Sequence, residues 1–139
     1  VVNVDTPQIQ WILARHQIPV ITPLASDQVG GVYNINADMA ACEIAAELKV
    51  RKLVFLSDVP GVLRNPEDPS SLISSIHCDE VEELVHSGVI RGGMIPKIRS
   101  ACEAVRAGVG QVHMIDGRLR HSLLLEIFTR KGVGTQILP

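Results

Sequence analysis

The sequence predicts an α/β fold in which a mainly parallel sheet is covered by helices on both faces. Apolar residues make up 46% of the 139 residues, which is enough for a single domain with a buried core. Short runs of continuous apolar, β-branched residues alternate with longer segments of helical periodicity. Continuous apolar strands are typical of sheets buried on both faces. We therefore expect a three-layer α/β/α sandwich over residues 1–139.

Residues up to 31 predict a helix, a strand and a turn. Thr6 is expected to cap a helix that carries Ile9 and Ile12 on one face. Residues 18–23 are short, apolar and β-branched, which predicts a buried strand. The glycines within residues 27–31 favour a turn.

The next segment predicts one helix and one strand. Residues 38–48 show a helical apolar stripe, and residues 52–56 read as a second buried strand. Pro60 and Gly61 indicate a turn directly after that strand. Residues 62–63 are expected to form half of a small hairpin, which a polar loop follows.

The second half of the chain predicts helices and strands in alternation. Asp79 is expected to cap a helix that ends at Gly88, and Gly108 is expected to end the next one. The expected helices are residues 79–87, 98–108 and 122–129, and the expected strands are residues 111–115 and 135–137.

Composition excludes several classes of partner. The net charge is −2 and aromatic residues are only 3%, so neither a nucleic-acid surface nor an anionic-membrane surface is indicated. No apolar run reaches the roughly 18 residues of a membrane helix, and no signal peptide is visible. Cys42, Cys78 and Cys102 are odd in number and far apart, which favours reduced, buried thiols. A cytoplasmic location is therefore expected.

Three polar loops carry the side chains that suit chemistry: residues 34–38, 57–61 and 89–97. Ligands of open α/β sheets gather at the carboxyl ends of the strands, where such loops lie. Each loop also has a plain structural reading. Asn36 can cap a helix, Asp38 can complement its dipole, and the residues from Ser57 can form an ordinary turn. Lys97 can likewise be a solvated lysine in the first turn of a helix, although a cation there opposes the helix dipole and so suggests an anionic partner.

Five motifs, taken in order, resemble the acetylglutamate kinases of the amino acid kinase family. They are residues 33–38, 56–63, 88–97, 113–118 and 123–135. The resemblance extends over about residues 4–137, and the motifs Asn-Ile-Asn-Ala-Asp and Gly-Gly-Met-Ile-Pro-Lys make it specific. It points to acetylglutamate kinases or to their relatives that act on an aminoadipate derivative.

The resemblance implies transfer of the γ-phosphoryl group of ATP, with Mg²⁺, to the side-chain carboxylate of N-acetyl-L-glutamate, the second step of arginine biosynthesis. A carboxylate and a triphosphate repel each other by several kcal/mol at about 4 Å, so the site needs cations. By motif, Lys97 would stabilise the transferring group and Asp38 would organise the catalytic lysines. Asn34 would hold the acetylglutamate, and Asn36 would support that pocket or cap the helix. A homo-oligomer is expected for the full-length protein.

The resemblance also implies a nucleotide site and an effector site. The nucleotide would contact Asp58, Val59, Pro60, Gly61, Val62, Leu63, Val89, Ile90, Arg91 and Met94, with Pro60 and Gly61 acting through backbone shape. Arginine-inhibited members bind L-arginine near the carboxyl end, where His113, Glu126 and Gly132 match. Glu126 would pair with that ligand. The plain alternative is a surface glutamate on a helix and a histidine at the end of a strand.

Parts of the family pattern find no match here. The family carries a glycine-rich phosphate-binding loop with a second lysine, and an arginine that contacts acetylglutamate, nearer the amino end. We therefore expect the carboxyl-terminal, nucleotide-binding portion of such a kinase, with residues 1–36 including part of the substrate-binding domain. We expect it to be inactive alone and to expose an apolar seam near Trp11.

Two other classes of function remain open. One is a regulatory module that binds arginine or nucleotide without catalysis. The other is a dinucleotide-binding domain, which predicts a G-x-G-x-x-G motif that this sequence lacks. The sequence leaves open whether the acceptor is acetylglutamate or the aminoadipate derivative. It also leaves open whether arginine or a PII-type protein regulates the enzyme.

Overall fold

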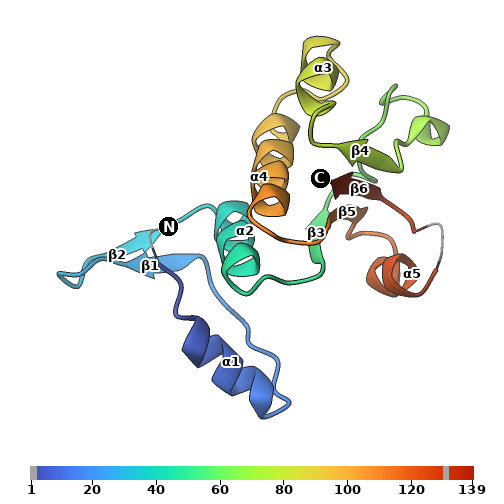
Figure 1. The fold of residues 1–139 in the computed structure, drawn as a ribbon. Helices are drawn as coiled ribbons and strands as arrows, with labels where there is room; N and C mark the ends of the chain where they lie inside the picture. Colours follow the sequence, from blue (N-terminus) through green and yellow to red (C-terminus); the bar gives the residue numbers. More distant parts are fainter. Residues whose placement is uncertain (1–2, 130–131) are drawn as a thin grey trace.

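A four-stranded mixed sheet forms the centre of the chain, as a computed structural model of residues 3–129 and 132–139 shows (Figure 1). Its strands, in spatial order, are β3 (Leu53–Ser57), β5 (Val112–Asp116), β6 (Thr135–Leu138) and β4 (Ser75–His77). The pairs β3–β5 and β4–β6 are parallel, whereas β5–β6 is antiparallel. The sheet is therefore mainly parallel, as predicted, with one reversal at its centre.

Helices cover both faces of this sheet (Figure 1). Helices α2 (Ala37–Glu47) and α4 (Met94–Arg106) pack together on one face, and the short α3 (Val81–His86) contacts α4. Helix α5 (Ser122–Phe128) lies against β5 on the other face. The predicted three-layer α/β/α arrangement is confirmed.

The core lies between the sheet and α4. The side chains of Ile76, Ile98, Val112, Met114 and Ile137 are all 0% exposed. Burying each such side chain stabilises the fold by about 1.5–3 kcal/mol. The three cysteines are also buried, and none forms a disulfide.

The amino-terminal part stands apart from the sheet (Figure 1). It consists of α1 (Thr6–Ala14), a connecting segment, and a hairpin of β1 (Leu24–Ser26) and β2 (Val32–Asn34) around the predicted turn. Helix α1 buries none of its residues, and Trp11 is exposed, as expected. Arg15 stacks over the Trp11 ring at 3.5 Å and shields it only partly.

The prediction of a buried strand at residues 18–23 is wrong. The segment is not a strand, and Ile18 and Val20 are 88% and 91% exposed. Its composition fits a strand, but a strand forms only when a neighbouring strand completes its hydrogen bonds. Within residues 3–129 and 132–139, its end is hydrogen-bonded to the chain after β2, from the Ile35 N–H to the Pro23 carbonyl at 2.9 Å, but no strand pairs with residues 18–22.

Two predicted helix starts are also wrong. Asp5, not Thr6, caps α1, because its carboxylate accepts a hydrogen bond from the Gln8 N–H at 3.2 Å. Glu80, not Asp79, precedes α3, and the Glu80 carboxylate turns back to accept from the His77 N–H. An acidic side chain therefore caps α1, whereas the Glu80 side chain forms no capping hydrogen bond with α3.

Several elements differ in extent from the prediction. Helix α4 begins at Met94, ahead of the expected start at residue 98, because Pro96 fits the first turn of a helix. The predicted half-hairpin at residues 62–63 is reduced to a single antiparallel bridge between Leu63 and Leu72. Among residues 3–129 and 132–139, no helix combines the length and the apolar character that crossing a bilayer requires.

Candidate active site

The start of α2 presents a carboxylate next to α4. The Asn36 side chain accepts a hydrogen bond from the Met39 N–H at 3.0 Å and so caps the helix. Asp38 follows in the first turn, where a negative charge complements the helix dipole. Asn34 ends β2 and is exposed. The capping role of Asn36 is therefore observed directly.

Lys97 lies in the first turn of α4 and faces Asp38. Its Nζ is 3.5 Å from the Asp38 carboxylate, and the two side chains are 21% and 34% exposed. The Phe55 ring of β3 lies 5.8 Å from the same ammonium. The two residues that the motifs assign to catalysis thus form an ion pair across the contact between α2 and α4.

The charge balance around Lys97 favours an anion. The amino end of α4 is the positive end of its dipole, and the ammonium adds a positive charge at the same place. Asp38 carries the opposite charge, but an ion pair at 3.5 Å that solvent still reaches is weak, so an anionic ligand can compete with Asp38 for Lys97. A negatively charged ligand is therefore favoured here.

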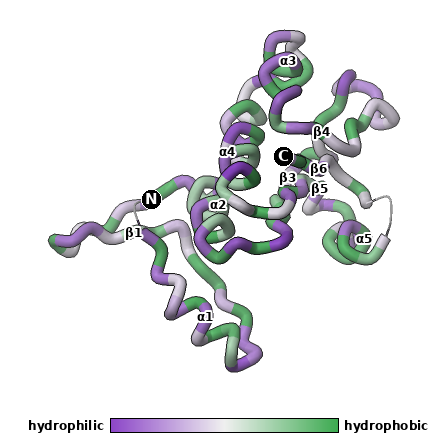
Figure 2. The backbone as a smooth tube through the Cα atoms, viewed as in Figure 1, coloured by the Kyte–Doolittle hydropathy of each residue, from purple (hydrophilic) through white to green (hydrophobic). Residues whose placement is uncertain are grey.

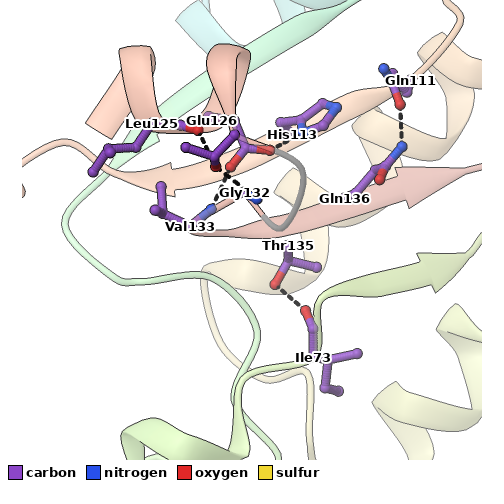
Figure 3. A network of polar contacts seen from close by, with 10 residues as sticks. Ile73, Gln111, His113, Leu125, Glu126, Gly132, Val133, Thr135 and Gln136 are labelled. Carbon is purple, nitrogen blue, oxygen red and sulfur yellow. Dashed lines mark hydrogen bonds and ion pairs between the residues drawn. The ribbon is translucent and has the colours of Figure 1, made fainter. Parts of the chain in front are cut away.

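The loop after β3 is fixed by the last strand of the sheet. Gly61 has φ +142°, and a Cβ there would lie 2.5 Å from the Thr135 hydroxyl. That hydroxyl accepts a hydrogen bond from the Val62 N–H at 2.8 Å. It donates a hydrogen bond to the Ile73 carbonyl at 2.7 Å (Figure 3). Only glycine fits at position 61, so this residue shapes the loop through its backbone.

The ten residues assigned to the nucleotide differ in accessibility. Asp58 and Arg91 are exposed, whereas Met94 packs partly against the core. Val62 and Ile90 are only 2% and 1% exposed. Val62 and Ile90 therefore offer a ligand almost no accessible surface, and their N–H groups already donate to the Thr135 hydroxyl and the Leu84 carbonyl.

Sequence reasoning did not assign a role to Asp116 and Arg118, which lie beside Asp58. The Gly117 N–H donates to the Ser57 carbonyl at 2.8 Å, so the ends of β3 and β5 are adjacent. Arg118 binds both oxygens of Asp116 at 2.9 Å, and these hydrogen bonds hold the pKa of Asp116 below its usual value. An Asp-Gly-Arg run directly after a buried strand was the available signal.

The three residues assigned to an effector come together where α5 packs against the sheet (Figure 3). His113 Nδ1 is hydrogen-bonded to the Glu126 carboxylate, and both side chains are 6% exposed. The Val133 N–H donates to the same carboxylate at 2.8 Å. Gly132 has φ +64°, and a Cβ there would lie 2.8 Å from a Glu126 oxygen.

This cluster is buried, so the alternative of a surface glutamate and a strand-end histidine is wrong. His113 lies within β5, and burial lowers its pKa, although the hydrogen bond with Glu126 opposes that shift. Within the described part of the chain, His113 Nε2 is buried and has no hydrogen-bond partner. The Glu126 carboxylate is already used by His113 and Val133.

Comparison with known proteins identifies a family. The model of the amino acid kinase family matches residues 1–116. The acetylglutamate kinase of Heliobacterium modesticaldum is 55% identical over 99% of this chain, and that of Aquifex aeolicus is 51% identical over 99%. The matched regions are 47% and 45% of those two enzymes, so the chain spans about half the length of the curated relatives it matches.

A solved structure shares the fold. The N-acetylglutamate synthase of Neisseria gonorrhoeae, solved with coenzyme A and L-arginine, superposes with a TM-score of 0.89 at 30% identity. The match covers 98% of this chain and 31% of that protein.

Proposed function

Because the chain belongs to the amino acid kinase family, we propose that it is the nucleotide-binding part of an acetylglutamate kinase. In the whole protein, the γ-phosphoryl group of ATP would pass to the side-chain carboxylate of N-acetyl-L-glutamate. The observation that carries the proposal is the ion pair between Lys97 and Asp38 at the amino end of α4. Relatives named acetylglutamate kinase, at 55% and 51% identity, support this choice of acceptor.

The proposed role of Lys97 follows from the charges of the reactants. Both the attacking carboxylate and the phosphoryl group are anionic, and the transition state spreads negative charge over the phosphoryl oxygens. An ammonium placed in advance stabilises that charge at no further cost of reorganisation. Asp38, 3.5 Å away, would hold Lys97 in position. Alignment of the two reactants would supply the remaining rate enhancement.

The nucleotide would lie along the loops that follow β3 and α3. Within residues 58–63 and 89–91, Asp58 and Arg91 offer exposed charged side chains, whereas Gly61, Val62 and Ile90 are buried and would shape the loops. Mg²⁺ would enter with ATP, since this ion keeps most of its ligands from phosphates and water. Asn34 and residues 1–36 would contribute to the pocket for acetylglutamate.

A chimera tests this proposal. The chain replaces the matching 138 residues of the Heliobacterium modesticaldum acetylglutamate kinase, and phosphorylation of N-acetyl-L-glutamate is measured. We expect turnover by the chimera and none by the isolated chain, which spans under half of the relative. A folded chimera that binds an ATP analogue without transferring phosphate would overturn the proposal.

We also propose that the cluster of His113, Glu126 and Gly132 responds to L-arginine. The supporting observation is that all three residues meet beside α5 (Figure 3). The arginine-bound synthase of Neisseria gonorrhoeae is 30% identical to the chain. Calorimetry with L-arginine tests the idea, and we expect binding to weaken in a Glu126→Gln variant. If the chain binds L-arginine but does not bind ATP analogues, the result would favour the alternative of a regulatory module without catalysis.

A further inference from the structure

A hydroxyl from β6 is inserted between the two ends of a polar loop. Val62 and Ile73 face each other like a pair in an antiparallel ladder, which normally exchanges two direct hydrogen bonds. One of these forms, from the Ile73 N–H to the Val62 carbonyl at 2.9 Å. In place of the other, the Val62 N–H donates to the Thr135 hydroxyl at 2.8 Å. That hydroxyl passes the contact on, because it donates to the Ile73 carbonyl at 2.7 Å (Figure 3).

The sheet fixes the position of this hydroxyl. The Thr135 side chain is 0% exposed, and Thr135 pairs with Met114 of β5. A Cβ at Gly134 would collide with the Met114 carbonyl, so the backbone before Thr135 packs directly against β5. One residue earlier, the Val133 N–H donates to the buried Glu126 carboxylate at 2.8 Å. The hydroxyl is therefore held in place before any ligand arrives.

The chain around Val62 has few other contacts that could set its shape. Residues 64–71 are hydrophilic, so they bring little apolar surface to bury (Figure 2). Residues 58–61 run between two fixed points, since the Ser57 carbonyl accepts from the Gly117 N–H at 2.8 Å and Thr135 holds Val62. Among the residues that the structure describes, no backbone hydrogen bond involves residues 58–61.

We infer that Thr135 is a positioning residue for the nucleotide, because its hydroxyl sets the shape of residues 58–61 and so places the exposed Asp58 side chain. Thr135 acts through the loop and does not itself touch the nucleotide, since its side chain is buried. A loop that is held in its binding shape in advance costs the ligand less ordering. The inference rests on the proposed function, in which this loop contacts ATP.

Substitution of Thr135 in the chimeric kinase tests this inference. Thr135→Val keeps the shape of the side chain and removes the hydroxyl, which leaves the Val62 N–H without an acceptor. We expect the KM for ATP to rise by about tenfold or more, because a buried group that loses its partner forces the loop to shift. The KM for N-acetyl-L-glutamate should change by less than about twofold, which a general loss of structure would not produce. Thr135→Ser keeps the hydroxyl and should restore the KM for ATP.

Thr129→Val is the matched control. The Thr129 hydroxyl also donates to a buried-side backbone carbonyl, that of Leu125 at 2.6 Å, but it lies at the end of α5 and does not contact residues 58–63. The KM for ATP should be unaltered in this variant. Thr129→Val therefore separates the loss of any threonine hydroxyl from the loss of the one that holds the loop.

Gly61→Ala disturbs the same contact from the side of the loop. Its new Cβ would lie 2.5 Å from the Thr135 hydroxyl, whereas Gly108, which also has positive φ, faces open space. Gly61→Ala should raise the KM for ATP and Gly108→Ala should not. If Thr135→Val does not fold, this pair decides, and equal values of the KM for ATP would overturn the inference.

Three other results would overturn the inference. The folded Thr135→Val kinase keeps its KM for ATP, both KM values rise equally, or Thr135→Ser fails to restore the KM for ATP. A chimera that transfers no phosphate would contradict the proposed function and not this inference. Calorimetry with adenylyl-imidodiphosphate then replaces the kinetic measurement, and an unchanged affinity in Thr135→Val would contradict the role of the hydroxyl.

Discussion

Two of the acid–base pairs in the described part of the chain are built in opposite ways. The Lys97–Asp38 pair bridges two helices at 3.5 Å, with 21% and 34% of the side chains exposed. The His113–Glu126 pair joins α5 to β5 with both side chains only 6% exposed, and the backbone of Val133 adds a further hydrogen bond. The first pair is loose and reached by solvent, and the second is buried and fully engaged at the carboxylate.

This difference separates a contact that a ligand can rearrange at little cost from one that it can rearrange only at a high cost. An exposed ion pair contributes about 0–1 kcal/mol, so an incoming anion can draw Lys97 away at little cost. Removing one partner of a buried pair costs about 3–5 kcal/mol, so the His113–Glu126 contact persists unless a ligand replaces what it loses. Each prediction below alters one pair and asks whether activity or stability responds.

The largest effect is expected for Lys97→Met in the chimeric kinase. Loss of one preorganised charge should lower kcat by about 10²–10³-fold. The free energy of unfolding should change by less than about 1 kcal/mol. Arg99→Met is the matched control, because Arg99 lies on the same helix and forms an exposed pair with Glu82 at 2.8 Å. Equal losses of kcat in Lys97→Met and Arg99→Met would show that the charge of Lys97 matters no more than that of an exposed residue on the same helix.

Glu126→Ala should destabilise the chain by about 2–4 kcal/mol, because it leaves His113 and the Val133 N–H buried without an acceptor. Urea denaturation of the isolated chain measures this change. Glu82→Ala removes a glutamate from an exposed pair and should cost less than about 1 kcal/mol. A similar cost for both variants would show that the buried pair contributes no more than a surface one.

Gly132→Ala sharpens the comparison by disturbing the buried carboxylate alone. Gly132 and Gly88 both have positive φ, +64° and +76°, so an alanine at either should cost about 1–2 kcal/mol of backbone strain. Only at Gly132 would the new Cβ meet Glu126, at 2.8 Å, whereas Gly88 faces open space. Gly132→Ala should therefore be the more destabilising by about 1 kcal/mol. Equal urea midpoints would contradict the packing described for Glu126.

The smallest effect is a dependence of stability on pH. Burial lowers the pKa of His113 in the folded state below the ordinary 6.5. The unfolded chain therefore binds the proton more readily, and His113 contributes stability above its unfolded pKa that is lost as the pH falls through its folded pKa. Urea midpoints from pH 8 to pH 5 measure this loss, in the wild type and in His113→Gln. The stability of His113→Gln should depend less on pH than that of the wild type. Identical curves for the two proteins would show that other groups cause the dependence on pH.

Local sequence predicted most of the sheet and the helices on it. Strand β3 was recognisable as an apolar run, β5 as a mostly apolar run, and β6 from the glycines before it. Asn36 followed by Asp38 marked the start of α2. The facing of Lys97 and Asp38 was not visible in local periodicity, and it followed from the family motifs. The partner of Arg118 was not predicted, because its signal was only a short polar run after a strand.

The missed features depend on contacts distant in sequence. Strand β4 has three residues, and it exists because residue 75 pairs with residue 136. The antiparallel pairing of β6 with β5 likewise depends on which strands become neighbours, and the periodicity of the sequence does not show this. The prediction of a strand at residues 18–23 was wrong for the opposite reason. Their composition suits a strand, but the described residues do not supply a strand beside them.

The hydroxyl of Thr135 has a consequence for the order in which the protein is made. It bridges the Val62 N–H and the Ile73 carbonyl, and Gly61 lets the backbone come that close. Ribosomes release a chain from its amino end, so the loop beside Gly61 emerges long before Thr135 does. The loop after β3 therefore takes its final shape only after β6 has emerged, and a nascent chain stalled before Thr135 should leave the Val62 N–H without this acceptor.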